Sequence, residues 1–262
     1  MFYFDGGVVP AGQFSFPFQV QVPNWLPPSF LWKYRDMDEK YKASIKYKIK
    51  AYIQDRTGRD KPIYGKRVLL INPPMPPPGQ SAELHAEKNV TSCCCIDQGP
   101  VSINCMFEKN VYFPNESVRA IVNVDSSKCT GTCEHISLKL MREVRIRAGG
   151  TQKGKDFKMA GIREAGFEPK GTVQKMMNLD LNSFSAQFGS QLNAQRKKGK
   201  MYAEEEIYLA SKVQASVNSR LISCNYFIVV KPNYGSCDCC RNPPSVKLPL
   251  SLINPQMMEA MT

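Results

Sequence analysis

Histidine is the scarcest residue with catalytic chemistry: the chain has 262 residues and only two histidines, His85 and His135. Histidine is the side chain whose ordinary pKa best suits proton transfer near neutral pH. Neither a glycine-rich phosphate loop nor a serine elbow accompanies these two residues. The sequence therefore predicts a protein that is not an enzyme.

Long uninterrupted apolar runs are also missing. The uncharged stretch of residues 6–32 contains five prolines, which exclude a membrane-spanning helix. Residues 1–5 lack the basic region that begins a secretory signal peptide. Without such a signal, the ten cysteines are typical of thiols or metal ligands rather than of a disulfide framework.

Negative charge is in the minority. The chain has 23 Asp and Glu against 35 Lys and Arg, which gives a formal net charge of +12. This excess suggests two kinds of partner, nucleic acid and an anionic membrane surface. The 19 prolines and 17 glycines disfavour long helices and favour short strands joined by turns.

What the sequence has in abundance is hydrophobic alternation with a period of two, the pattern of a half-buried strand. In residues 45–53, lysines alternate with apolar side chains. Residues 148–172 are polar, basic and glycine-rich, which predicts a long excursion between strands. We therefore predict an all-β sandwich. The expected strands are 14–22, 45–53, 101–107, 118–124, 136–146, 221–230 and 246–252.

A proline-rich segment, residues 73–79 (PPMPPPG), predicts a linker stiffened toward polyproline II. We expect a first domain over 1–72, a linker over 73–88, a second domain over 89–255 and a tail over 256–262. The first region has few strands for an independent sandwich. It is expected either to dock on the second region or to belong to a larger domain.

Several motifs, in order and at matching spacing, resemble a known family. In the first region they are residues 9–18 (VPAGQFSFPF), 26–30 (LPPSF) and 45–51 (IKYKIKA). In the second they are residues 93–95 (CCC), 99–103 (GPVSI), 112–118 (YFPNESV), 226–230 (YFIVV) and 246–250 (VKLPL). The chain resembles the arrestins, and among them most closely the alpha-arrestins (arrestin-domain-containing proteins).

The resemblance implies arrestin-like immunoglobulin-type β-sandwiches, with a complete C-terminal domain preceded by a partial N-terminal domain. It further implies a non-catalytic adaptor or scaffold that binds membrane cargo or protein partners in intracellular trafficking. Such a protein is cytoplasmic, or peripheral at the endosomal or plasma membrane. The alternative is a structural subunit of a large assembly, in which partners complete the truncated N-terminal domain.

Two departures from the family pattern limit what carries over. Val68 stands where phosphate-sensing arrestins have a polar-core arginine, and the adjacent Arg67 would point to the opposite face of its strand. We therefore do not expect activation by receptor phosphates. The Pro-Pro-x-Tyr motif that recruits ubiquitin ligases is also absent, because Phe30 occupies the tyrosine position after Pro27 and Pro28.

The cysteines concentrate in three predicted loops. Strand parity places the first two loops at one pole of the sandwich, and the resemblance places the third there. Three interpretations stay open: a structural zinc site, scattered reduced thiols, or S-acylated cysteines at a membrane-facing edge. Cys105 and Cys224 lie inside predicted strands and are expected to be packing residues. The candidate zinc ligands are Cys93, Cys94, Cys95, Cys129, Cys133, Cys237, Cys239 and Cys240.

Basic residues are concentrated in two regions, 33–67 and 139–200. They predict binding of anionic lipid headgroups, inositol phosphates or acidic partner tails, with solvated faces and loops as the alternative. Nucleic acid is disfavoured, because aromatic residues are not interleaved beyond Tyr41, Tyr47 and Tyr52. The residues assigned to the anionic surface are Lys46, Lys48, Lys50, Arg196, Lys197, Lys198 and Lys200.

Overall fold

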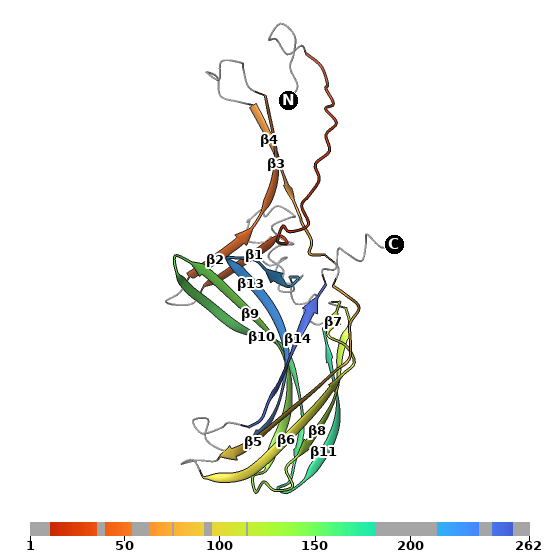
Figure 1. Ribbon diagram of the computed structural model, residues 1–262, viewed down its shortest axis with the longest axis vertical. Helices are drawn as coiled ribbons and strands as arrows, with labels where there is room; N and C mark the ends of the chain where they lie inside the picture. The colour runs from red at the N-terminus through yellow and green to blue at the C-terminus, as the bar shows by residue number, and fades with distance from the viewer. Residues whose placement is uncertain are drawn as a thin grey trace, which may run out of the picture.

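The structure is a computed structural model, shown in Figure 1. It describes residues 11–35, 40–53, 63–74, 76–91, 96–113, 115–181, 214–235 and 243–253. In these ranges every regular element is a β-strand, from β1 to β14, which confirms the predicted all-β class. Within the same ranges, no helix is long and apolar enough to span a membrane.

Two sheets form the larger part of the molecule, below β1 and β2 in Figure 1. The first, here the long sheet, has the strand order β10-β9-β13-β14-β7, with β12 paired to β13. The second has the order β11-β8-β6-β5. The long sheet is built from β7 (Val111–Tyr112), β9 (Cys133–Ala148), β10 (Thr151–Phe167), β12 (Val217–Asn218), β13 (Ile222–Tyr234) and β14 (Val246–Leu252). The second comprises β5 (Ala82–Thr91), β6 (Asp97–Phe107), β8 (Ser117–Asp125) and β11 (Thr172–Asp180).

The core lies between these two sheets because several of their strands, among them β6, β8, β13 and β14, bury every second side chain along much of their length. In β13 buried and half-buried residues alternate along the whole strand. Leu138, Ile228 and Val122 are all fully buried and belong to one hydrophobic cluster drawn from both sheets. Full burial of such a side chain contributes about 1.5–3 kcal/mol. The predicted strands 101–107, 118–124, 136–146 and 246–252 are confirmed, and 221–230 is confirmed from Ile222 onward.

The predicted excursion over residues 148–172 is wrong. Most of it forms β10, which pairs with β9 from Thr151 to Phe167 through a bulge at Met159. Gly149 and Gly150 have positive φ angles of 57° and 78° and form the turn between the two strands. Because β10 lies at the edge of the sheet, its composition is polar, and alternation gave no signal of the strand.

The first region contains two separate hairpins. β1 (Phe30–Arg35) pairs with β2 (Lys40–Ile45), and β3 (Tyr47–Ile53) pairs with β4 (Ile63–Leu69). The single strand expected over 45–53 is therefore divided at Lys46, with its two parts in different sheets. In Figure 1 the β3–β4 hairpin extends away from the sandwich, while β1 and β2 lie at the upper end of β9, β10 and β13.

Aromatic stacking joins β1 and β2 to the long sheet. The Trp32 ring stacks on Tyr41 at 5.9 Å between centroids and meets the edge of Phe157 at 6.0 Å. The Gln214 side chain bridges the same junction: its Oε1 accepts from Leu31 N–H at 3.1 Å, and its Nε2 donates to Leu31 C=O at 2.6 Å. These contacts dock the first region on the second. Docking is one of the two arrangements that the sequence led us to expect.

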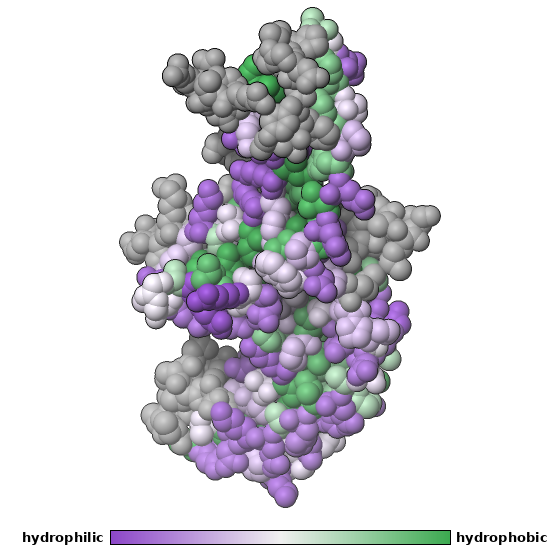
Figure 2. Space-filling model, turned by 45° about the horizontal axis from the view of Figure 1, so that its top comes forward, coloured by the Kyte–Doolittle hydropathy of each residue, from purple (hydrophilic) through white to green (hydrophobic). Residues whose placement is uncertain are grey.

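The segment expected to form a strand over 14–22 is extended, but has no ladder partner among the described residues. Its apolar side chains are exposed, from 42% for Phe16 to 71% for Val20. In Figure 2 hydrophobic side chains reach the surface in the upper and middle parts of the molecule, whereas hydrophilic ones dominate the lower part. The alternative of a subunit completed by partners stays a prediction.

Candidate functional site

The described parts of the three cysteine-bearing segments meet at the end of the sandwich opposite the hairpins, here called the distal tip. Thr130 N–H donates to Gln98 C=O at 2.8 Å, which joins the start of β6 to the loop over residues 126–132. Gly235 N–H donates to Thr132 C=O at 3.4 Å, which brings the end of β13 to the same loop. The segments that flank all three cysteine groups therefore lie together.

Of the eight candidate zinc ligands, only Cys129 and Cys133 lie in the described residues. Both are free thiols buried in the core. Burial raises the pKa of Cys133 to about 11, so this thiol is protonated at neutral pH. Next to them, the hydroxyls of Ser126 and Tyr234 form a buried hydrogen bond that holds the loop against β13. Cys93, Cys94, Cys95, Cys237, Cys239 and Cys240 lie outside the described residues.

The other two cysteines are packing residues, as predicted. Cys105 in β6 and Cys224 in β13 are both fully buried. Burial raises the pKa of Cys105 to about 12 and that of Cys224 to about 11. Within the described part of the chain, no group of three or more His, Cys, Asp or Glu residues could hold a metal ion.

The β3–β4 hairpin carries a basic face. In the antiparallel register Lys50 lies opposite Lys66, and Tyr52 lies opposite Tyr64. The ammonium group of Lys50 sits 4.6 Å from the centroid of the Tyr64 ring and 6.0 Å from that of Tyr52. Both tyrosines are 57% exposed. Lysines and interfacial tyrosines together are suited to an anionic lipid surface.

Of the lysines predicted there, Lys48 and Lys50 are exposed on this face, together with Lys66. Lys46 is half-buried at the bend between β2 and β3. Arg67 lies on the opposite face from Val68, as predicted, and is paired with Ile49. Arg196, Lys197, Lys198 and Lys200 lie outside the described residues.

A second basic surface lies on the outer face of the long sheet; we call it the outer-face cluster. It consists of Lys139 on β9, Lys158 and Arg163 on β10, and Lys231 on β13. Lys139 lies between the buried Leu138 and Leu140, so strand alternation directs it away from the core. The sequence placed three of the four residues in a basic region without grouping them, because their proximity depends on strand pairing.

The positive charges of the outer-face cluster are close enough to perturb one another. The pKa of Lys139 is lowered by burial and by the nearby charges of Lys158, Arg163 and Lys231. None of the four forms an ion pair among the described residues. The cluster is therefore a concentration of positive charge that no acid in the described residues offsets through an ion pair.

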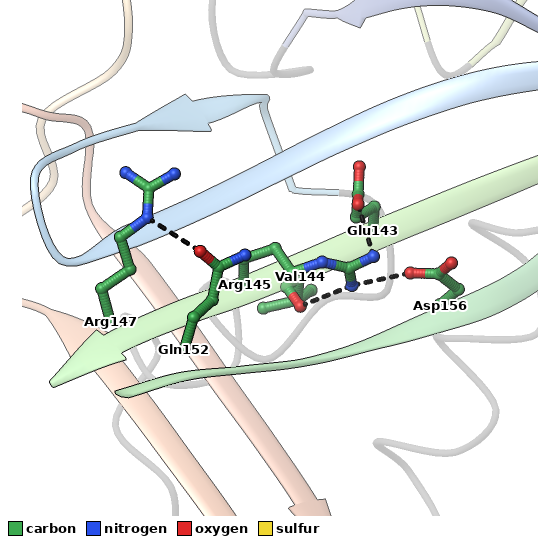
Figure 3. Close-up of polar contacts among 6 residues, drawn as sticks. All are labelled: Glu143, Val144, Arg145, Arg147, Gln152 and Asp156. Carbon is green, nitrogen blue, oxygen red and sulfur yellow. Dashed lines mark hydrogen bonds and ion pairs between the residues drawn. The ribbon is translucent and has the colours of Figure 1, made fainter. Parts of the chain in front are cut away.

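The acids next to the cluster are already engaged. One row beyond Lys158, Asp156 lies opposite Glu143. As Figure 3 shows, Arg145 contacts both, with its Nη1 donating to Asp156 Oδ1 at 2.7 Å and its Nη2 paired with Glu143. Farther along the same strands, Arg147 Nε donates to Gln152 Oε1 at 3.3 Å. Arg145 thus pairs with both carboxylates but offsets only one of their two negative charges, so one negative charge remains a row away from the four cations of the outer-face cluster.

The two packed sheets, in which all pairs except β14 with β7 are antiparallel, and the docked hairpins of the first region define an all-β sandwich protein with a second, smaller part. The family description "Arrestin (or S-antigen), C-terminal domain" matches residues 97–257, more than half of the chain. "Arrestin (or S-antigen), N-terminal domain" matches residues 6–75. The chain belongs to the arrestin family, as the sequence motifs indicated.

The chain is also similar to a protein described as containing arrestin domains. This relative is "Arrestin domain-containing protein A" of Dictyostelium discoideum, with 28% identity over 145 residues. The similarity covers 55% of this chain and 24% of that protein. The chain thus spans about a quarter of the length of this relative. Family membership supports an adaptor role in general.

Proposed function

We propose that this protein is a non-catalytic adaptor in intracellular trafficking, which binds membrane cargo or protein partners at the cytoplasmic surface of the endosomal or plasma membrane. The observation that carries the membrane part is the basic face of the β3–β4 hairpin. Lys48, Lys50 and Lys66 are exposed there beside an exposed tyrosine pair. Each basic residue near an anionic bilayer contributes about 1 kcal/mol of binding.

Charge reversal on the hairpin tests this contact. Lys48→Glu/Lys50→Glu is expected to lower binding to phosphatidylserine-containing vesicles by about tenfold or more, because two attractive charges become repulsive. The measurement is vesicle co-sedimentation at low and at physiological salt. The matched control is Lys88→Glu/Lys128→Glu, which reverses two exposed lysines of the two-sheet sandwich, one on β5 and one in the loop over residues 126–132. If the Lys48→Glu/Lys50→Glu variant binds the vesicles as tightly as the parent and the control do, the hairpin is not the membrane contact.

We also propose that structural zinc holds the distal tip. The support is the convergence of the three cysteine-flanking segments and the chemistry of the donors, since thiolate sulfur is a preferred zinc ligand. Zinc would stabilise the tip by holding loops that are far apart in sequence. Cys129 and Cys133 would join the site only by losing their protons, and the raised pKa of Cys133 opposes this step.

Elemental analysis with a thiol titration tests the zinc proposal. The expected result is at least one zinc ion per chain, and more titratable thiols after a chelator is added than before. The zinc content of the Cys129→Ala/Cys133→Ala variant, compared with that of the parent, shows whether these two buried residues are ligands. A metal-free protein whose surface thiols react without chelator would exclude the zinc site.

A further inference from the structure

The outer face of the second sheet carries a row of apolar side chains, here called the apolar strip. Strand pairing places Met106 on β6 opposite Ile121 on β8, and Ile121 opposite Met176 on β11. Each is adjacent in its strand to a buried residue, so alternation directs its own side chain away from the core. Met106 is 40% exposed and Met176 is 76% exposed, whereas Ile121 between them is half-buried. The strip therefore crosses three strands at the surface.

Polar side chains adjoin the apolar strip on the side of the distal tip. Asn104 Nδ2 donates to Glu83 Oε1 at 2.7 Å. Because Glu83 lies opposite Met106, this hydrogen bond holds a carboxylate at the β5 end of the strip. The amide and imidazole groups of this polar row can hydrogen-bond to a bound partner. The row crosses all four strands and consists of His85, Asn104, Asn123 and Gln174.

The charge of this face is opposite in sign to that of the whole chain, which is +12. Arg119 is the single cation among the outward-facing residues of β5, β6, β8 and β11, all of which the structure describes. Its Nη1 lies 4.0 Å from Glu108 Oε2. Lys88 faces the other way, since it lies opposite the buried Val101. Acids stand at the β5 end of the strip and on both sides of it: Glu83, Glu87, Glu108, Asp125 and Asp180.

The dimensions of the apolar strip match an α-helix that lies across the strands. Neighbouring strands are about 4.7–4.9 Å apart, and a helix rises about 5.4 Å per turn. Such a helix places one apolar side chain per turn against each residue of the strip. An extended chain repeats about every 6.6–6.8 Å and would fall out of step with the strands.

The acids are within reach of the flanks of the same helix. They stand one or two rows from the apolar strip, about 7–13 Å along the strands. A helix is about 10–12 Å wide with its side chains, and lysine and arginine extend their charges beyond an apolar contact. Basic residues on both flanks would therefore meet carboxylates while the apolar stripe covers the strip.

We infer that the apolar strip binds a basic amphipathic helix of a partner protein. Apolar side chains at positions i, i+4 and i+7 of the helix contact Met176, Ile121 and Met106. Methionine is suited to this contact because its flexible side chain adapts to apolar groups of different shape. The negative charge of the face selects a basic helix over an acidic one. The inference rests on the proposed adaptor role, but not on membrane contact by the hairpin or on zinc.

Peptide binding to the full chain tests the inference by fluorescence anisotropy. The probe is a labelled synthetic peptide of about four helical turns, with leucine at i, i+4, i+7 and i+11, lysine on both flanks and alanine elsewhere. One comparison peptide has the same composition with its leucines spread around the helix, and another has a central proline. We expect the amphipathic peptide to bind more tightly than both.

Loss of the two exposed methionines tests the apolar contact. Met106→Ser/Met176→Ser is expected to weaken binding of the amphipathic peptide by about tenfold or more. The matched control is Ile96→Ser/Leu221→Ser, which removes two apolar side chains outside the strip that are 60% and 58% exposed. The control should bind the peptide as the parent does. Both variants should keep the thermal transition of the parent, because the replaced side chains are exposed.

Charge reversal tests the acidic flanks. Glu87→Lys/Glu108→Lys places a cation on each side of the strip, and should weaken binding by about tenfold and reduce its dependence on salt. The matched control is Glu134→Lys/Glu168→Lys, which reverses two exposed acids outside the second sheet. Its affinity for the peptide should stay within about twofold of that of the parent, because these acids lie outside the proposed site.

Three results would overturn the inference. The first is equal affinity of the parent and the Met106→Ser/Met176→Ser variant for the amphipathic peptide. The second is equal affinity of the parent for the amphipathic peptide and the peptide with dispersed leucines, which would show attraction by charge alone. The third is equal affinity for the proline-containing peptide, which would exclude a helical partner.

The outcome is independent of the membrane contact. Lys48→Glu/Lys50→Glu should bind the amphipathic peptide as the parent does, even if it loses vesicle binding. A parent chain that binds the peptide but not the vesicles would refute only the membrane part of the proposed function. A parent chain that binds the vesicles but not the peptide would refute only the present inference.

Discussion

Replacing Gly99 with alanine is expected to destabilise the second domain by about 3 kcal/mol or more. Gly99 has a φ of 102°, a conformation that residues with a Cβ rarely adopt. A methyl group there would also overlap the backbone carbonyl oxygen of Lys128. This atom belongs to the loop that packs on the start of β6, so the backbone of the distal tip would have to move.

The measurement is thermal and urea unfolding of the full chain, and a lowering of Tm by about 10 °C is the expected size of the effect. The matched control is Gly65→Ala. Gly65 lies in β4 with nothing within 4 Å of an added methyl group, so its replacement should change stability by less than about 1 kcal/mol. Equal stability of the two variants would show that the Gly99 backbone is not constrained as described.

Replacing Gln214 with leucine is expected to detach β1 from the long sheet. The Gln214 side chain satisfies both the N–H and the C=O of Leu31, and its backbone N–H donates to the buried Tyr226 hydroxyl at 3.2 Å. Leucine has a similar size but makes neither side-chain hydrogen bond. A buried polar group left without a partner costs about 1–3 kcal/mol, and Leu31 would have two.

The effect can be followed by the fluorescence of Trp32, which is 3% exposed and packs at this junction. Trp25 is 76% exposed and is the other of the chain's two tryptophans, so it is first replaced with phenylalanine in all variants. Gln214→Leu should then shift the Trp32 emission to longer wavelength. Gln174→Leu, at an exposed position of β11, should not. An unchanged spectrum for Gln214→Leu would contradict this account of the junction.

Strand prediction from sequence worked where a strand has one face in the core. β6, β8, β13 and β14 bury alternate residues along much of their length, and β9 does so apart from the buried Ser137. Alternate burial appears in the sequence as apolar residues with a period of two. It failed for β10, an edge strand with a mostly polar sequence, and for the division of 45–53 at Lys46. Both depend on which strands pair, and pairing joins segments that are distant along the chain.

The candidate sites also combine features that the sequence reveals with features that depend on strand pairing. The lysine alternation of 48 and 50 was visible in the sequence, whereas their partner Lys66 became evident only from the register of β3 and β4. The outer-face cluster could not be predicted at all, because Lys139, Lys158, Arg163 and Lys231 come from three strands. Arg163 and Lys231 both lie opposite Ser137, on its two neighbouring strands. No pattern in the sequence around either residue reveals this arrangement.

The sequence by itself determined the all-β class, half of the strands from β5 to β14 and membership of the arrestin family. These follow from local properties: alternation, proline and glycine content, and motifs in a fixed order. Only the tertiary structure decided that residues 151–167 complete the long sheet, that the first region docks through Trp32 and Gln214, and that four cations gather on one face. These features depend on register and edge position, which the packing of the whole chain sets.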